Sequence, residues 1–204
     1  SSLNLAKYDE WKDTDVVEIA TYFLDGIMEE FIQKTNGKDS MVRSHRHAKK
    51  GRALGLGVMG WHTFLQQKQL PFNSIASTAW THTIFSDIRT KSEAASRQLA
   101  IEYGEPLWCR GTGMRNTHVM AIAPTVSNSR INTCSAGIEP HPANVYVFNG
   151  AKGTFIVRNP ELEKLLISKG KNQNKHWEKI LSDNGSVQNL SSDILTEEEK
   201  EIFL

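Results

Sequence analysis

The stretch VMAIAPTVSNSRINTCSAGIEPHP, residues 119–142, holds the strongest local signals for the fold. Residues 119–123 are apolar and short, and Pro124 follows them, which is typical of a buried strand that ends at a turn. The residues after the proline are small and neutral, and no carboxylate occurs before Glu139. The pattern predicts a strand over 119–123, then a polar turn, with a helix beginning after Pro124.

Two interpretations of this turn are open. The first turn of a helix has backbone N–H groups without intrahelical acceptors and a partial positive charge, so it can hold phosphate oxygens. Pro124 has no N–H to leave unsatisfied there, and the short side chains of Ser127, Asn128 and Ser129 let a phosphate approach. The same residues suit an ordinary capped helix after a strand, and their spacing alone favours that plainer interpretation.

Length and composition indicate a globular protein. The 204 residues are 39% hydrophobic and 23% charged, which suits one domain, or a large part of one, with a packed core. The formal net charge of +1 predicts no strongly acidic or basic partner. Neither a long apolar run nor a signal-peptide pattern occurs, so we expect no membrane segment. Cys109 and Cys134 lack metal-ligand spacing and are interpreted as reduced thiols of a cytoplasmic protein.

Helical periodicity predicts a helix-dominant α/β fold. A helix over 14–32 is expected to have a capping box of Asp15 and Glu18 and an apolar face of Val16, Ile19, Ala20, Phe23, Leu24, Ile27, Met28 and Phe31. A long helix from Asn73 or Ser74 to Gly104 is expected to bury Ala76, Ala79, Trp80, Ile84, Ile88, Ala95 and Leu99. Shorter helices are predicted from near Met59 to Pro71, from Pro160 to about Ser168, over NKHWEKILSDNGS, and after a capping box of Thr196 and Glu199. The segments NVYVFN and GTFIVRN, joined by GAKG, predict a hairpin.

Two further segments invite functional interpretations that the residues do not favour. The basic stretch 34–52 has seven Lys or Arg and one Asp, and it is predicted to be an exposed loop. It has no interleaved aromatic residue, and His45 with His47 is a poor metal signal, so nucleic-acid binding is the weaker alternative. GLGVMG, residues 55–60, matches G-x-G-x-x-G, but no adequate strand precedes it and no carboxylate follows before Asp87. Close backbone packing is therefore favoured over dinucleotide binding.

The cysteines and the isolated Glu139 give little indication of a catalytic role. Neither Cys109 nor Cys134 has a neighbouring base in the sequence, so both are interpreted as packing or loop thiols. Glu139 is the one carboxylate in a small and apolar context, and we expect it to orient its loop by accepting backbone N–H groups. No catalytic residue and no metal ligand is predicted.

Several segments together resemble one known family. SLNLAKYDEW, RALGLGVMGWHTFLQQKQLPFNS, MRNTHVMAIAPTVSNS and AGIEPHPANVYV, followed by DNGSVQNL and LTEEEKEIF, occur in this order over nearly the whole chain. They are similar to segments of the large, catalytic subunit of class I ribonucleotide reductase. The pair GLGVMG and AIAPT…GIEP, at this separation, is far more specific than either segment alone.

The resemblance implies a fold and an activity. The family's large subunit is a ten-stranded α/β barrel of two antiparallel halves with five parallel strands each. Residues 1–204 would then form roughly the C-terminal half of this barrel, truncated at both ends. The activity implied is reduction of ribonucleoside diphosphates to 2′-deoxyribonucleoside diphosphates by thiyl-radical chemistry, in deoxyribonucleotide biosynthesis for DNA replication.

The resemblance also implies a site. The family's segment matching APTVSNS holds the substrate diphosphate, so the expected contacts are Pro124, Thr125, Val126, Ser127, Asn128 and Ser129, chiefly through backbone N–H groups. In the commoner family form small hydroxyl residues fill more of this turn. Val126, Asn128 and Arg130 are therefore departures, and Arg130 can either add charge near the phosphate or face solvent.

The remaining implications concern what this chain lacks. The family's radical cysteine and redox pair, its effector sites and its radical-pathway tyrosines match no residue here, so we expect no activity from the chain alone. The complete enzyme would need a radical-generating, metal-containing small subunit and an external dithiol reductant. Expected partners are a ribonucleoside diphosphate, the missing N-terminal part of the large subunit and that small subunit, with self-association also expected of a half barrel. The alternative is a non-catalytic phosphate- or nucleotide-binding module.

Overall fold

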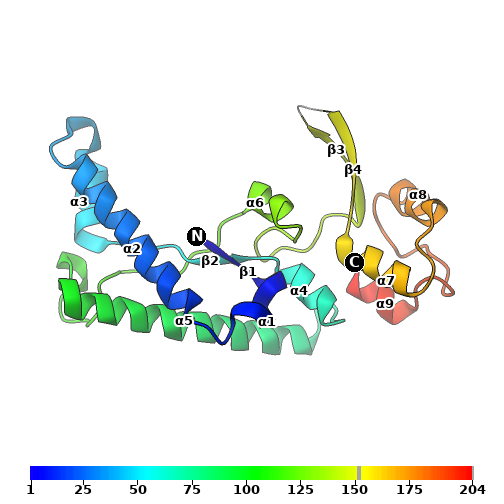
Figure 1. The fold of residues 1–204 in the computed structure, drawn as a ribbon, viewed down its shortest axis with the longest axis horizontal. Coiled ribbons are helices and arrows are strands. Elements are labelled where there is room, and N and C mark those ends of the chain that lie inside the picture. The colour runs from blue at the N-terminus through cyan, green and yellow to red at the C-terminus, as the bar shows by residue number, and fades with distance from the viewer. Residues whose placement is uncertain (151–152, 204) are drawn as a thin grey trace. The chain divides into compact units, whose positions relative to one another are not determined.

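The computed structural model describes residues 1–150 and 153–203 (Figure 1). The chain divides into two compact units. Unit 1 comprises Ser1–Val58 and Trp80–Pro124, and unit 2 comprises Met59–Ala79 and Thr125–Leu204. No helix within the described residues is both long enough and apolar enough to cross a membrane.

Unit 1 is mainly helical. Its elements are β1 (Ser2–Asn4), the 3-10 helix η1 (Leu5–Lys7), α1 (Tyr8–Trp11), α2 (Val16–Thr35), the 3-10 helix η2 (Asp39–Met41), α3 (Val42–Gly51), β2 (Gly57–Met59), most of α5 (Ile75–Tyr103) and the 3-10 helix η3 (Leu107–Cys109). Strand β1 pairs with β2. Helices α2 and α3 lie side by side, joined by the short connection that contains η2 (Figure 1).

The predicted strand over 119–123 is present only as an extended segment with one bridged residue. Met120 forms a parallel bridge with Leu56, and the Leu56 N–H donates to the Val119 carbonyl at 2.9 Å. The Ala121 N–H donates back to the Leu56 carbonyl at 3.1 Å. The rest of the segment forms no regular strand, so the prediction is right in place and wrong in extent.

The glycines of GLGVMG serve close packing, as predicted. A Cβ atom on Gly57 would overlap the backbone oxygen of Ala121, and one on Gly55 would lie 3.3 Å from the Ala121 Cβ. Gly60 has a φ of 81°, in the left-handed region that favours glycine, and it caps helix α4 (Trp61–Gln67). The motif therefore lets two backbone segments approach closely.

We predict that Gly57→Ala destabilises the protein by about 1–3 kcal/mol, because the added methyl group meets backbone that has no rotamer to move into. The matched control is Gly26→Ala in α2, where a Cβ would meet nothing within 4 Å. That variant should be neutral or stabilising, since alanine is the better helix former. Chemical denaturation of both variants checks the prediction, and equal effects at the two positions would contradict it.

Helix α2 confirms the predicted helix but not its buried face. Ile19, Phe23 and Ile27 are each about half exposed or more, while the buried positions are Val17, Thr21, Asp25, Ile32 and Thr35. The predicted capping box is also wrong, because Asp15 precedes the helix without a side-chain capping bond. Apolar periodicity misplaced the core here because the buried face carries an ion pair.

That ion pair is part of a polar cluster buried in unit 1. The Asp25 carboxylate accepts hydrogen bonds from Arg52 Nε at 3.0 Å and Arg52 Nη2 at 2.9 Å. It also accepts from Arg115 Nε at 3.0 Å and from Asn116 Nδ2 at 2.8 Å. All four residues are at most 9% exposed. The cluster links α2 to segments 27 and about 90 residues away in the sequence.

The basic stretch 34–52 was predicted to be a loop, and this is wrong. It forms η2 and the ten-residue helix α3, of which Ala48 and Gly51 are buried. A Cβ on Gly51 would lie 2.6 Å from the Trp108 ring, so α3 is held by close packing against η3. This tertiary contact overrides the local polar composition.

Helix α5 has the predicted ends. The Ser74 hydroxyl accepts the Ser77 N–H at 3.1 Å, and Gly104 follows the helix with a φ of 81°. Of the predicted buried face, Ile84, Ile88, Ala95 and Leu99 are buried. Ala76 and Ala79 are exposed, and Ser77 is buried in their place.

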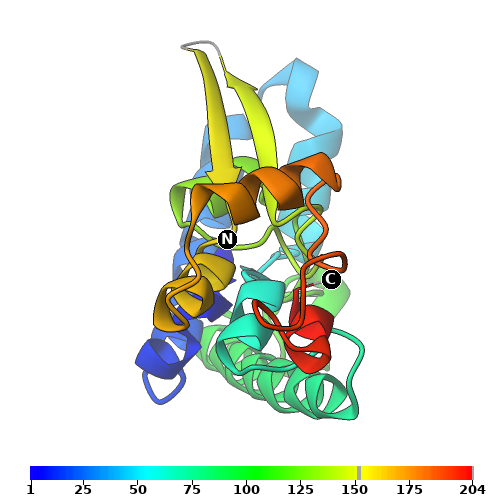
Figure 2. The same ribbon diagram turned by 90° about the vertical axis from the view of Figure 1, so that its right-hand side faces the viewer.

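Unit 2 combines short helices with one hairpin. Its elements are α4, the first residues of α5, α6 (Val126–Ile131), β3 (Val145–Gly150), β4 (Gly153–Arg158), α7 (Pro160–Ser168), α8 (Asn174–Ser182) and α9 (Glu197–Ile202). The predicted hairpin is confirmed, because β3 and β4 pair antiparallel with Val145 opposite Arg158 and Gly150 opposite Gly153. The two strands lie side by side in both ribbon views (Figures 1 and 2). Two residues of the predicted GAKG turn, 151–152, lie outside the described residues.

The predicted helix ends of unit 2 are confirmed where they depend on local caps. Asn159 accepts the Glu161 N–H at 3.1 Å just before Pro160 opens α7. Thr196 and Glu199 form the predicted capping box of α9. Gly185 has a φ of 84° and donates its N–H to the Ile180 carbonyl after α8. Each signal lies within a few residues of the helix end it sets.

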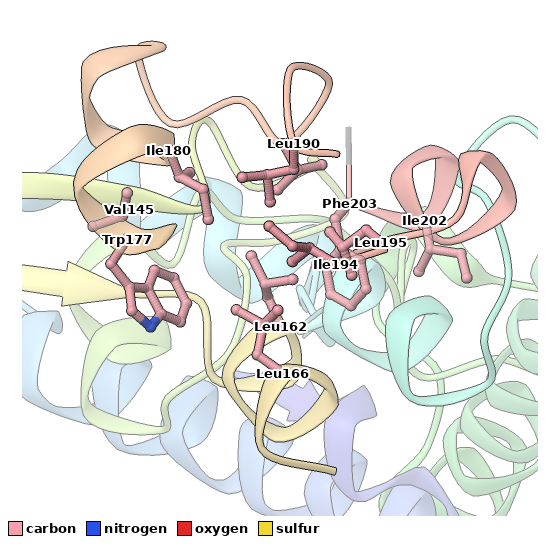
Figure 3. Close-up of a cluster of buried hydrophobic side chains, with 11 residues drawn as sticks. Val145, Leu162, Leu166, Trp177, Ile180, Leu190, Ile194, Leu195, Ile202 and Phe203 are labelled. Carbon is pink, nitrogen blue, oxygen red and sulfur yellow. The ribbon is translucent and has the colours of Figure 1, made fainter. Parts of the chain in front are cut away.

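The hydrophobic core of unit 2 lies among α7, α8, α9 and the start of β3 (Figure 3). Its residues are Val145, Leu162, Leu166, Trp177, Ile180, Val187, Leu190, Ile194, Leu195, Ile202 and Phe203. Ile202 and Phe203, at the end of the described chain, point into this cluster (Figure 3). The last helix is therefore an integral part of the unit.

Candidate functional site

The turn predicted to bind phosphate has an unusual backbone at Thr125. This residue is the N-cap of α6 and has a φ of 48° and a ψ of 26°, the left-handed region. A β-branched residue rarely adopts this conformation, which typically costs about 1–3 kcal/mol. Hydrogen bonds compensate, because the Thr125 hydroxyl accepts the Gly137 N–H at 2.8 Å and the Thr125 carbonyl accepts the Ser129 N–H at 2.8 Å.

The first turn of α6 leaves hydrogen-bond donors available. Within the described residues, the N–H groups of Val126, Ser127 and Asn128 have no acceptor. The side chains of these three residues are exposed. Ser129 differs, because it is buried and its hydroxyl donates to the Val126 carbonyl at 3.1 Å. Three adjacent backbone donors without acceptors in the described residues thus lie in the first turn of α6, beside the exposed side chains of Ser127 and Asn128.

Backbone hydrogen bonds connect the turn to the other two motifs within unit 2. Gly137 of GIEP donates to Thr125, and its carbonyl accepts the Trp61 N–H at 3.4 Å. Gly60 of GLGVMG donates to the Ser135 carbonyl at 2.8 Å. The structure therefore brings together the segments whose combination was distinctive in the sequence, with Gly60, Thr125 and Gly137 at the junctions.

A buried polar network supports these junctions, and sequence reasoning missed it. The Thr63 hydroxyl accepts the Ser135 N–H at 2.8 Å, and the Ser135 hydroxyl accepts the Thr63 N–H at 3.3 Å. His62 Nδ1 accepts the His141 N–H at 2.9 Å, and His62 Nε2 lies 3.3 Å from the Ile202 carbonyl. His62, Thr63 and Ser135 are at most 2% exposed. The only sequence signal was a run of polar residues inside the apolar α4.

The two histidines of this network are held neutral. Burial lowers the pKa of His62 to about 4, although the hydrogen bond to the Ile202 carbonyl acts in the opposite direction. Burial, with a contribution from His62, also lowers the pKa of His141 to about 4. Because Nδ1 of His62 accepts a hydrogen bond, the neutral ring carries its proton on Nε2, which donates to Ile202. A second proton, on Nδ1 of His62, would point at the backbone N–H of His141 and break the hydrogen bond between them.

Other side chains near the turn have defined positions. The Arg130 guanidinium lies 4.2 Å from the centre of the Phe148 ring, a cation–π contact with β3. The Arg130 side chain thus stacks on the hairpin, a third arrangement beside the two considered from the sequence. Glu139 is exposed and accepts no hydrogen bond from the described residues, so its predicted role in orienting the loop is wrong.

The cysteines are packed rather than reactive. Both Cys109 and Cys134 are free and buried. Burial raises the pKa of Cys134 to about 11 and, together with Glu105, also raises the pKa of Cys109. Neither thiol is therefore activated at neutral pH. Within the described part of the chain, no three His, Cys, Asp or Glu residues are grouped to hold a metal ion.

Comparison with known proteins assigns the family of this fold. The family profile of the ribonucleotide reductase barrel domain matches residues 1–108 and 109–204. The chain belongs to this family. The predicted fold class, part of the α/β barrel of ribonucleotide reductases, is thereby confirmed, and the parallel bridge between Leu56 and Met120 is consistent with it.

Individual relatives agree with this assignment. The chain is 38% identical to the ribonucleoside-diphosphate reductase large subunit of Invertebrate iridescent virus 6, over all of this chain and 21% of that protein. It is 36% identical to a putative large subunit of Frog virus 3, over 94% of this chain and 34% of that protein. The class Id ribonucleotide reductase alpha subunit of Actinobacillus ureae matches with 45% identity and a TM-score of 0.91, over all of this chain and 37% of that one. The chain thus spans about a fifth to slightly over a third of these relatives.

Proposed function

We propose that this chain supplies the diphosphate-binding turn of a ribonucleoside-diphosphate reductase large subunit. The observation that carries the proposal is the set of unpaired N–H groups at Val126, Ser127 and Asn128, in a turn that Thr125 and Gly137 hold in a strained conformation. Strain maintained at an exposed polar turn is typical of a binding site. Family membership supports a ribonucleoside diphosphate as the substrate class, since the relatives are named ribonucleoside-diphosphate reductase large subunits.

The donors suit a diphosphate for physical reasons. Backbone N–H groups at the start of a helix point in one direction and need no reorganisation to meet phosphate oxygens. No carboxylate occurs between Glu105 and Glu139, so no acidic neighbour in this part of the sequence repels the anion. Pro124 and Thr125 set the approach of the chain, and Ser127 can add a hydroxyl donor. The carbonyl of Ser129 accepts the Cys134 N–H and so anchors the end of α6.

Titration of the ¹⁵N-labelled chain with a ribonucleoside diphosphate tests the site. We expect amide shifts at Val126, Ser127 and Asn128, and none with the nucleoside that lacks phosphates. Ser127→Asp should weaken binding tenfold or more, because a carboxylate beside the donors repels the phosphates and competes for the N–H groups. Ile131→Asp, at the exposed C-terminal end of the same helix, is the matched control and should weaken binding only slightly.

The outcomes separate the possible functions. Equal losses from Ser127→Asp and Ile131→Asp would show non-specific charge attraction and would contradict the site. Binding of inorganic diphosphate as tight as that of the nucleotide would favour the alternative, a phosphate-binding module without a nucleoside-specific role. Amide shifts confined to residues outside 125–129 would place any site elsewhere.

We expect no reductase turnover from this 204-residue chain by itself. Reduction of the 2′-hydroxyl needs a reactive thiol and a reducing dithiol. The two cysteines of this chain are buried, and their pKa values are raised. Ellman's reagent should therefore react slowly with the folded chain at neutral pH and quickly after denaturation. Deoxynucleotide formation by the purified chain, or fast labelling of the folded thiols, would contradict this.

The proposal also names partners. The chain would work with the remaining part of a large subunit and with a radical-generating small subunit, and an external dithiol would restore the redox cysteines of the whole enzyme. The half-exposed apolar residues Ile19, Tyr22, Phe23 and Ile27 on α2 support a further chain segment or self-association at that face. A cytoplasmic location, which suits reduced thiols, stays a prediction.

A further inference from the structure

A small basic hollow lies at the junction of α2 and α3 in unit 1. Its volume is about 300 Å³. The residues that line it are Thr35, Gly37, Lys38, Val42, His45, Arg46, Lys49 and Lys50. Four of these eight residues carry a full positive charge, and none is acidic.

Helical spacing explains why the charges gather there. Residues 42, 45, 46, 49 and 50 fall on one face of α3, at separations of three, four, seven and eight. Lys38 adds a fourth cation from the connection before η2. Arg43 and His47 line a separate apolar hollow against α2. The side chains of α3 thus line two different hollows.

Among the residues that the structure describes, the four cations of the hollow form no ion pair. No carboxylate lies within 4 Å of Lys38, Arg46, Lys49 or Lys50 in the described chain. By contrast, Lys34 pairs with Glu30, and Arg52 pairs with Asp25 and Glu29. Asp39 is the one carboxylate between Glu30 and Asp87, and it does not line the hollow.

This charge arrangement is unfavourable without an anion. Arg46 lies three and four residues before Lys49 and Lys50, and like charges at these separations repel on a helix surface. Lys49 and Lys50 do favour the last turn of α3 through the helix dipole, but Arg46 and Lys38 gain nothing from it. A multivalent anion in the hollow would offset the repulsion among all four.

One side of the hollow is held in place by hydrogen bonds of the Thr35 hydroxyl. The Thr35 hydroxyl donates to the Phe31 carbonyl at 2.7 Å, so it accepts from His45 Nδ1, which lies 3.0 Å away. This assigns the His45 proton to Nδ1 and holds the ring at the C-terminal end of α2. Thr35 is buried, so the contact is shielded from water. Thr35 and His45 thus form a hydrogen-bonded wall of the hollow.

We propose that this hollow binds a small polyphosphate anion. Its volume is at the lower end for small-molecule pockets, which suits a compact ligand. Apart from His45 no ring lines it, so it offers no stacking surface for the bases of a nucleic acid. Val42 and the methylene stems of the lysines form the walls, and their charged heads reach the phosphate oxygens at the rim. The proposal does not depend on the diphosphate-binding turn.

Calorimetric titration of the chain with inorganic tripolyphosphate tests the proposal. In the Ser127→Asp background, which disables the phosphate-binding turn, we expect one site, with affinity that falls steeply as salt rises. Arg46→Gln should weaken binding at least fivefold. Arg43→Gln is the matched control, because it removes the same charge from an exposed position of α3 that lines the separate hollow against α2, and it should change affinity less than twofold.

Each alternative outcome overturns the proposal. Equal weakening by Arg46→Gln and Arg43→Gln would show diffuse attraction to a basic helix. Absence of binding at millimolar tripolyphosphate and low salt, with circular dichroism showing folded protein, would mean that the four cations are solvated surface charges that bind no anion. A single-stranded oligonucleotide that binds more tightly than tripolyphosphate, and more tightly with length, would identify a nucleic-acid surface instead.

Discussion

Replacing Asp25 with alanine is expected to lower the free energy of unfolding by about 3–5 kcal/mol. Asp25 accepts four hydrogen bonds from Arg52, Arg115 and Asn116, and all these side chains are nearly inaccessible to water. Without the carboxylate, two guanidinium groups stay buried, with Glu29 as the remaining acidic neighbour, 2.7 Å from Arg52 and 3.9 Å from Arg115. The free energy of unfolding falls because the buried guanidinium groups lose their counter-charge. The intact ion pair itself adds little net stability.

The matched control is Glu30→Ala on the same helix. Glu30 pairs with Lys34 at 2.6 Å, but both side chains are mostly exposed. Exposed pairs at this spacing contribute about 0.3–0.5 kcal/mol. Denaturant unfolding of the two variants should therefore differ by several kcal/mol. If Asp25→Ala costs under about 1 kcal/mol, the cluster does not hold unit 1 together.

Asp25 also shows why the buried face of α2 could not be predicted. Periodicity assigns burial to apolar residues, so Ile19, Phe23 and Ile27 were expected in the core. The partners that make burial of Asp25 possible, Arg52 and Arg115, lie far along the chain. No local sequence pattern predicts such an arrangement. Helix α3 was not predicted for a related reason, since its packing against η3 depends on a contact between Gly51 and Trp108.

Elements with local signals were predicted well. Pro160 at the start of α7, the capping box of Thr196 and Glu199, and the glycines that follow α5 and α8 act within one helical turn, so the sequence alone locates those ends. The strand pairing of β3 with β4 is likewise local. Short-range hydrogen bonds are readable from sequence because both partners appear in the same short window.

The candidate site depends both on local signals, which the sequence shows, and on distant contacts, which it does not. A helix after Pro124 was predictable, but the left-handed conformation of Thr125 was not, since threonine disfavours it. Its stability comes from Gly137, twelve residues later, and from the Gly60 and Thr63 contacts to Ser135. The resemblance to a family supplied what local propensity could not, because it reports the combination of segments rather than each one.

Acidification from pH 6.5 to pH 4 is expected to destabilise unit 2. The pKa of His62 is about 4 in the folded chain and near 6.5 in the unfolded chain. The unfolded chain therefore binds a proton first, so the stabilisation is complete above pH 6.5 and is lost as the pH falls toward 4. A shift of this size corresponds to about 3 kcal/mol for one histidine, and His141 adds to the loss because its pKa is lowered as well.

Denaturant unfolding from pH 7.5 to pH 4 measures this dependence. His62→Gln should be less stable at pH 7.5 but should show a shallower loss with acidification, because one of the two groups that take up a proton on unfolding is gone. His82→Gln, at an exposed position of α5, is the control and should keep the full pH dependence.

The buried polar cluster around Asp25 in unit 1 responds at lower pH. Burial alone would raise the pKa of Asp25, but hydrogen bonds from Arg52, Asn116 and Arg115 outweigh it, and the pKa is lowered below its usual 3.8. Its stabilisation is thus kept above pH 3.8 and lost only as the pH falls through that lowered value. Unit 2 should therefore unfold before unit 1 as the pH falls, and NMR signals of the two units that disappear together near pH 5 would contradict this order.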